Sequence, residues 1–320
     1  MRREGSPWQG LGTVTMKEMA DHLTSARMRV LELLIVVTAF VVIYFATQQI
    51  KETTAEDPFV FLKLFTTGRP PLPSFVAILG FLIPLMAIGL GFDAINGEYN
   101  RRTLSRILSQ PIYRDALLLG KFFAGLGTLA ISLVCLWMIL IGFGLLRLGV
   151  PPSGEEVGRS MIFLLVALAY AGVWLAVAIL FSILFRSPAT AALVSLGLWL
   201  FLAILWPMLS PALAAAISPP ELPYLMRGLP DPGTLEWTQA LARLSPNQLF
   251  AEAITAILNP DTRSLGLIFV SQYEGAVMGS PLPLTQSLLI AWPQIVGLAA
   301  STIVLFVAGY IAFQRQEVRA

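Results

Sequence analysis

Residues 91–125 read GFDAINGEYNRRTLSRILSQPIYRDALLLGKFFAG, a charged segment between two long apolar runs. The segment holds five of the 21 lysine and arginine residues of the chain: Arg101, Arg102, Arg106, Arg114 and Lys121. The chain of 320 residues is 56% hydrophobic and only 12% charged, whereas soluble domains carry about 25% charged residues. Such a segment predicts a structured cytoplasmic connection between two membrane spans.

Six apolar runs are long enough to cross a membrane as helices: residues 30–47, 75–92, 122–146, 160–185, 189–209 and 288–313. The hydrocarbon core of a bilayer is about 30 Å thick, and a helix of about 20 apolar residues spans it. The sequence therefore predicts an all-α integral membrane protein with six transmembrane helices. We expect one membrane domain, residues 30–320, after a polar N-terminal region, residues 1–29.

The distribution of basic residues predicts the orientation of these spans. An even number of spans places both termini on one side of the membrane, and that side carries 13 of the 21 lysine and arginine residues. Cytoplasmic loops are enriched in lysine and arginine. We therefore expect a multi-pass protein of the plasma or inner membrane with both termini in the cytoplasm. Residues 1–27 show no removable signal peptide.

The connections on the opposite side differ in length. Residues 210–285 form a long, proline-rich segment between the fifth and sixth spans. Within it, Ser245-Pro246 and Asn259-Pro260 enclose a run with apolar residues at helical spacing. Proline at the start of a helix and just beyond its end is a typical boundary signal. We expect a long extracytoplasmic loop that contains one short helix.

The connection between the second and third spans has a helical pattern from Glu98 to Ser109. Leu104, Ile107 and Leu108 lie on one face of this helix. Arg101 and Arg102 lie on the other faces, Asn96-Gly97 provides a turn or cap before it, and Pro111 ends it. A short basic amphipathic helix of this kind fits a docking element, and it equally fits a helix that lies on anionic lipid head groups.

A second amphipathic helix is predicted near the N-terminus. Thr15 and Glu18 have the spacing of a capping box. In this motif the threonine side chain accepts a hydrogen bond from the backbone N–H of the glutamate, and the glutamate side chain accepts one from the backbone N–H of the threonine. Met19 and Leu23, with Met16 and Val30, recur along one face. We expect this helix to lie along the cytoplasmic interface, with His22 on its solvated face.

Several classes of function find no support in the sequence. The chain has no G-x-x-x-x-G-K-[ST] motif and therefore no nucleotide-binding P-loop of its own. It has one cysteine, no hydrolase motif and no metal-ligand cluster, and its net charge of +2 gives no indication of nucleic-acid binding. The predicted spans are almost free of ionisable residues, which ion-coupled carriers often use as relays. If the protein moves a substrate uphill, we expect the energy to come from another protein.

The central segment resembles a known family of membrane proteins. The blocks Phe92-Asp93-Ala94-Ile95-Asn96-Gly97-Glu98, Leu108-Ser109-Gln110-Pro111-Ile112 and Leu119-Gly120-Lys121-Phe122 are similar to those of permease subunits of ABC-type-2 transporters. The resemblance is greatest to the branch with the copper-site maturation permease of nitrous oxide reductase operons. Lys17-Glu18, Ser245-Pro246 and the six-span arrangement agree with it. Many relatives have acidic residues or glycine where this chain has Tyr99-Asn100-Arg101-Arg102.

The resemblance implies that the chain is the membrane half of an ABC exporter and is not itself an enzyme. It implies a second copy or a related permease, and two separate ATPase subunits that bind ATP and Mg. The connection between spans two and three would be a coupling helix that docks on an ATPase, with the interfacial helix beside it. The implied coupling residues are Glu98, Arg101, Arg102, Leu104, Ile107, Leu108 and Pro111, and the implied interfacial residues are Thr15, Glu18, Met19 and Leu23.

Two other functions remain open at this point. The chain could be a non-transporting anchor or scaffold that recruits a cytoplasmic partner, and an ion-coupled carrier is a further alternative. The substrate is also open: an apolar lining for lipid-like or amphipathic cargo and an ordinary interfacial aromatic belt explain the same residues. These residues are Phe81, Trp199, Phe201, Trp206 and Met208.

Overall fold

A computed structural model describes residues 8, 10–53, 59–68, 73–103, 113–227, 231–265 and 281–316. Within these ranges, six helices are long and apolar enough to cross a membrane: Ala26–Ile50, Phe75–Asn100, Arg114–Leu148, Gly154–Leu184, Pro188–Ile217 and Leu284–Arg315. The six predicted spans are thus confirmed, and each helix is longer than the apolar run that predicted it.

The spans are formed by α2 (Ala26–Thr53), α4 (Phe75–Gly91), α7 (Arg114–Leu148), α8 (Gly154–Leu184), α14 (Leu284–Arg315) and a fifth helix in three parts. The three parts are α9 (Pro188–Leu200), the π-helical turn η1 (Phe201–Leu205) and α10 (Trp206–Ile217). The shorter helices are α1 (Leu11–Thr24), α3 (Val60–Thr66), α5 (Asn96–Asn100), α11 (Leu222–Arg227), α12 (Pro232–Ala242) and α13 (Pro246–Leu258).

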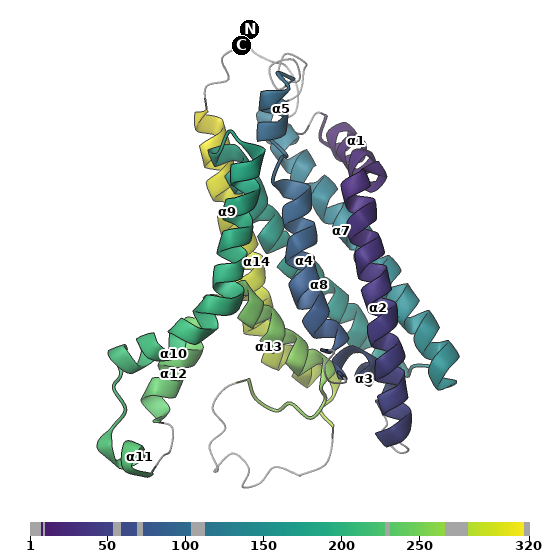
Figure 1. The fold of residues 1–320 in the computed structure, drawn as a ribbon, viewed down its shortest axis with the longest axis vertical. Helices are drawn as coiled ribbons and strands as arrows, with labels where there is room; N and C mark the ends of the chain where they lie inside the picture. Colours follow the sequence, from purple (N-terminus) through teal and green to yellow (C-terminus); the bar gives the residue numbers. More distant parts are fainter. Residues whose placement is uncertain are drawn as a thin grey trace.

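Helix α8 is the central helix of the bundle (Figure 1) and packs against α4, α7, α13 and α14. Its Phe163, Tyr170 and Trp174 side chains are completely or almost completely buried. The helix begins where Ser153 and Glu156 form a capping box, which satisfies backbone N–H groups that lack an intrahelical partner. The core of the protein is therefore built around α8.

The two ends of the bundle carry different elements (Figure 1). Helices α1 and α5 and the last turns of α14 lie at one end, which we call the terminal end, and Arg114 Nη1 there donates to the carbonyl of Gln316 at 3.1 Å. Helix α3 and the far end of α13 lie at the other end, which we call the loop end. The beginning and the end of the described chain thus lie together, as an even number of spans requires.

The predicted cap of the N-terminal helix is wrong. Helix α1 begins at Leu11, after Gly10 in the left-handed region with φ of 86°, so Thr15 lies inside the helix. The Thr15 hydroxyl donates to the carbonyl of Leu11 at 2.8 Å. The Glu18 carboxylate does not return to a cap, because lysine side chains bind it.

The helix predicted from Glu98 to Ser109 is present only as far as Asn100 within its described part and is wrong for residues 101–103. Helix α5 begins at Asn96 and ends at Asn100, and Arg102 has a left-handed backbone with φ of 55° that a continuous helix does not allow. Asn96-Gly97, expected as a turn before the helix, lies inside it because Asn96 is bound by the end of α8. Leu104, Ile107, Leu108 and Pro111 lie outside the described residues.

The long connection after the fifth span contains more helix than expected. The fifth helix continues to Ile217, although it contains Pro207 and Pro211, and at η1 the Trp206 N–H donates to the carbonyl of Phe201. Helix α12 packs against α10, and Trp206 Nε1 donates to the carbonyl of Leu241 at 2.8 Å. The predicted short helix, observed as α13, is confirmed, and it packs against α8 and α14.

Candidate functional site

Three charged side chains at the terminal end connect α1, α5 and α7. Lys121 Nζ of α7 lies 3.0 Å from Glu18 Oε2 of α1 and 2.7 Å from Glu98 Oε1 of α5. The exposed fractions are 4% for Lys121, 13% for Glu18 and 15% for Glu98. We call this group the Lys121 triad. Since the three charges are withdrawn from solvent, Lys121 and Glu98 depend on the triad for compensation, and Glu18 is paired with Lys17 as well.

The close packing of α1 on α7 brings the triad together. A Cβ added at Gly120 would lie 2.7 Å from Cγ1 of Val14, a distance that real side chains do not reach. Glycine at this position therefore lets α1 approach α7 closely, one residue before Lys121. Val14 is buried in this contact, and Met19 packs near Gly127 further along.

The end of α8 holds the turn between α4 and α5. The backbone N–H groups of Ile95 and Asn96 donate to Ser182 Oγ at 2.9 and 3.2 Å. Asn96 Nδ2 donates to the carbonyl of Phe185 at 3.1 Å. Helix α5 is thus fixed on one side by α8 and on the other by the Lys121 triad.

A second ion pair lies beside the triad. Arg27 Nη2, in the first turn of α2, is 2.8 Å from Asp93 Oδ2 in the turn after α4. A small cavity of about 180 Å³ separates this pair from the triad, and His22 and Arg101 are among its lining residues. His22 is partly buried against this cavity and not fully solvated as predicted, and burial lowers the pKa of its imidazole. His22 is therefore neutral near pH 7.

The pKa of the Glu18 carboxyl is also lowered. Burial by itself would raise this pKa, but the Lys121 ammonium and hydrogen bonds from Lys17 and Lys121 outweigh the burial. Because the pKa in the folded protein lies below the ordinary value of 4.5, the carboxylate contributes its full stabilisation above that pH. The contribution is lost as the pH falls through the lower, folded-state pKa.

This linkage gives a testable pH dependence. The difference in melting temperature between the wild type and Glu18→Gln should stay constant above about pH 5 and shrink at lower pH, since acid removes from the wild type the charge that the variant lacks. Thermal unfolding of both proteins across a pH series would measure it. A difference that is the same at every pH would contradict the assigned role of the Glu18 charge.

The structure brings together only part of the predicted coupling set. Glu18 and Glu98 meet at Lys121, which is not among the predicted site residues. Arg101 and Arg102 are exposed immediately after α5, and Leu23 is partly buried on α1. The sequence signal that points to Lys121 is a lysine at the start of an apolar run. A lysine buried in such a run needs a counter-charge beside it.

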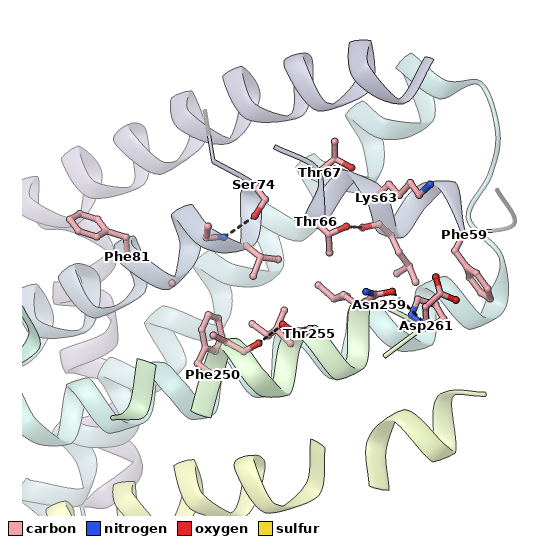
Figure 2. A pocket seen from close by; sticks show the side chains of 18 of the residues that line it. Phe59, Lys63, Thr66, Thr67, Ser74, Phe81, Phe250, Thr255, Asn259 and Asp261 are labelled. Atoms are coloured by element: carbon pink, nitrogen blue, oxygen red, sulfur yellow. Dashed lines mark hydrogen bonds between the residues drawn. The ribbon is translucent and has the colours of Figure 1, made fainter. Parts of the chain in front are cut away.

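A larger cavity of about 1350 Å³ lies at the loop end, between α3, α4 and α13 (Figure 2). Phe81 and Trp199, two of the five aromatic or apolar residues proposed as a lining, line it with ring centroids 4.7 Å apart. Phe201, Trp206 and Met208 are not among the described residues that line it. The fold therefore offers a linked charged site at one end and a cavity at the other.

Comparison with known proteins identifies the family. Residues 13–318 match the ABC-2 family transporter protein model. Over 150 residues the chain is 29% identical to a probable ABC transporter permease protein NosY of Pseudomonas aeruginosa, with 47% of this chain and 49% of that protein covered. Over 99 residues it is 37% identical to a probable NosY permease of Stutzerimonas stutzeri, with 31% and 34% covered. The matched stretches thus span about half or less of these relatives. With the family model covering almost its whole length, the chain belongs to the ABC-2 transporter family as a membrane permease.

Proposed function

We propose that this permease is the membrane subunit of an ABC exporter, driven by ATP hydrolysis in separate ATPase subunits. The proposal includes two ATPase subunits, which bind the ATP and Mg, and a second permease that is either another copy or a related chain. The observation that carries it is the Lys121 triad, which joins the exposed segment at Arg101 and Arg102 to the spans. Membership of the ABC-2 family supports the general assignment.

The contacts of α5 define a route for transmitting movement. A partner that displaces the segment after α5 would move Glu98, and Glu98 is bound through Lys121 to α7 and α1. The same displacement would act on α8 through Ser182 and the carbonyl of Phe185. Helices α1, α5, α7 and the end of α8 would then shift together, since buried ion pairs and hydrogen bonds are costly to break.

The orientation in this proposal places the terminal end in the cytoplasm. The excess of lysine and arginine on that side supports it. The loop end, with the large cavity, would then face the other side of the membrane, where an exporter releases its substrate. Exposed apolar side chains along α9 and α10, including Leu193, Met208 and Leu213, offer a surface for lipid or for the second permease.

Charge reversal at the exposed arginines tests the docking surface. The double variant Arg101→Glu, Arg102→Glu should fold normally, because both side chains are exposed. It should weaken association with the ATPase by about tenfold or more, since like charges facing each other across an interface are costly. The measurement is the amount of ATPase that copurifies and the stimulated rate of ATP hydrolysis.

The matched control is Arg29→Glu, Arg315→Glu, which makes the same charge change at exposed positions of α2 and α14. The control should bind ATPase like the wild type. Unchanged assembly and unchanged stimulated hydrolysis in the Arg101, Arg102 variant would overturn the docking assignment. A bound partner without any ATPase activity would favour the scaffold function instead.

A further inference from the structure

The large cavity at the loop end has two chemically different halves (Figure 2). Its inner half is lined by aromatic side chains, among them Phe81 on α4 and Phe250 on α13. Its outer half is lined by polar side chains, among them Lys63, Thr66, Ser74, Asn259 and Asp261. A bound molecule would thus meet a largely apolar surface at one end and, at the other, a mainly polar surface that also includes Phe59.

The inner half is rigidly built. The Tyr170 ring stacks on Phe250 with centroids 4.3 Å apart, and the Tyr170 hydroxyl lies 2.5 Å from Asn247 Oδ1. Asn247 Nδ2 is buried and has no hydrogen-bond partner within the described residues. Because this donor is enclosed by the protein, the inner half offers a ligand the apolar faces of its aromatic rings.

The outer half carries charges of both signs. Lys63 comes from α3, and Asp261 follows α13. The nearby hydroxyls of Thr66 and Thr255 donate to the carbonyls of Leu62 and Ala251 at 3.4 and 2.7 Å, which leaves their oxygens able to accept hydrogen bonds. A head group that is zwitterionic, or that both donates and accepts hydrogen bonds, matches this rim.

The size of the cavity narrows the class of ligand. Pockets for drug-sized molecules measure about 300–1,000 Å³, and this cavity measures about 1350 Å³. A small ion or small polar solute would leave the aromatic half empty, and a purely apolar molecule would make no polar contact with the rim. We propose that the cavity binds an amphiphile, with its apolar body at the end lined by Phe81 and Phe250 and its polar head group at the end lined by Lys63 and Asp261.

This inference rests on the proposed function only where the amphiphile is taken to be the exported substrate. Two sources have the required chemistry: a membrane lipid that enters from the bilayer, and a soluble single-chain amphiphile. Tightly held phospholipid in the purified wild-type protein, found by mass spectrometry and lost when the cavity is filled, would indicate the lipid. Saturable binding without copurified phospholipid would indicate the soluble amphiphile.

Two alanines allow the cavity to be filled without disturbing the core. Ala77 on α4 and Ala251 on α13 are exposed and line it from opposite walls. Ala77→Trp should therefore occupy ligand space while the fold is retained, and Ala251→Trp does the same from the other side. The matched control is Ala300→Trp at an exposed position of α14 that is not part of the lining.

The experiment is photolabelling of the full chain in phosphatidylcholine nanodiscs, with lysophosphatidylcholine that carries a diazirine in its acyl chain. We expect saturable labelling of α4 and α13 that unlabelled lysophosphatidylcholine competes away. Filling the cavity should raise the half-saturating concentration by about tenfold or more, because several ligand atoms lose their contacts, and Ala300→Trp should not change it. A diazirine-labelled alkyl alcohol of the same chain length, without the head group, should label these helices more weakly.

Labelling spread evenly over α2, α14 and the cavity helices would overturn the proposal. So would unchanged labelling in both Ala77→Trp and Ala251→Trp when their melting temperatures match the wild type. Copurification of the ATPase is measured on the same samples. Retained ATPase with no saturable labelling disproves the cavity assignment alone, whereas saturable labelling without any ATPase partner disproves the proposed exporter alone.

Discussion

Replacement of Lys121 by methionine is expected to lower the free energy of unfolding by about 3–5 kcal/mol, the usual cost of removing one partner from a buried ion pair. Methionine is close to the lysine stem in size, so the packing of α1 on α7 is disturbed little. The loss arises because Glu98, 15% exposed, would remain buried without this counter-charge, and Glu18, 13% exposed, would keep only the exposed Lys17. Thermal unfolding of the purified protein measures it.

Two further variants separate the charge from the packing at this position. Lys121→Arg keeps the charge but replaces the single ammonium nitrogen, which contacts both carboxylates, with a planar guanidinium. We therefore expect its free energy of unfolding to lie between those of the wild type and Lys121→Met. The triple variant Lys121→Met, Glu18→Gln, Glu98→Gln removes all three charges and should recover most of the stability, since buried ion pairs can often be replaced by neutral groups.

The triple variant also tests coupling. If the Lys121 triad transmits movement from α5 to α1 and α7, the triple variant should be stable and bind the ATPase, yet show reduced ATP-dependent transport. Full transport by the triple variant would mean that the triad only supports the fold. A Lys121→Met protein as stable as the wild type would contradict the burial and pairing described here.

The spans could be predicted from the sequence because they depend on local properties. A run of about 20 apolar residues crosses the bilayer as a helix whatever its neighbours are, and all six runs do form such helices. Helix α13 was predictable for a similar reason, since Pro246 at its first turn and Asn259-Pro260 after it mark both ends. Such signals need no knowledge of tertiary contacts.

The Lys121 triad could not be predicted in this way. Glu18 and Lys121 are 103 positions apart in the chain, and nothing local indicates that they meet. The capping box at Thr15 and Glu18 fails because α1 begins four residues earlier, at Leu11, so Thr15 lies inside the helix. The Glu18 side chain is then free to pair with Lys17 and Lys121.

Helices α3 and α12 were missed although one of them carries a clear signal. Asp231 caps α12 through a bond from the Thr234 N–H at 3.0 Å, and Pro232 occupies its first turn. This aspartate–proline start is a standard helix signal. The continuation of the fifth span to Ile217 had no such signal, because Pro207 and Pro211 favour an earlier end.

Replacement of Arg159 by leucine is expected to have an effect of similar size at the loop end, with a loss of about 3–5 kcal/mol in the free energy of unfolding. Arg159 is completely buried. Its guanidinium donates to the carbonyl of Ile257 at 2.7 Å, to Ser287 Oγ at 3.1 Å and to Glu155 Oε1 at 3.0 Å, and it also binds the carbonyl of Leu282. Leucine would leave these acceptors without donors. Arg159→Lys should restore only part of the stability, because one ammonium cannot match the planar fork of the guanidinium.

The consequence of this change extends to the cavity. Arg159 fixes the carbonyl of Ile257, and the next residues, Leu258, Asn259 and Pro260, line the outer half. Hydrogen exchange in the last turn of α13 should therefore accelerate in Arg159→Leu by about tenfold or more, while the exposed control Arg29→Leu leaves it unchanged. Saturable labelling by the lysophosphatidylcholine probe should weaken together with that protection, since the polar rim depends on the same carbonyl anchor. Faster exchange with undiminished labelling would show that the rim does not hold the head group, and the aromatic half would then be the whole of the binding site.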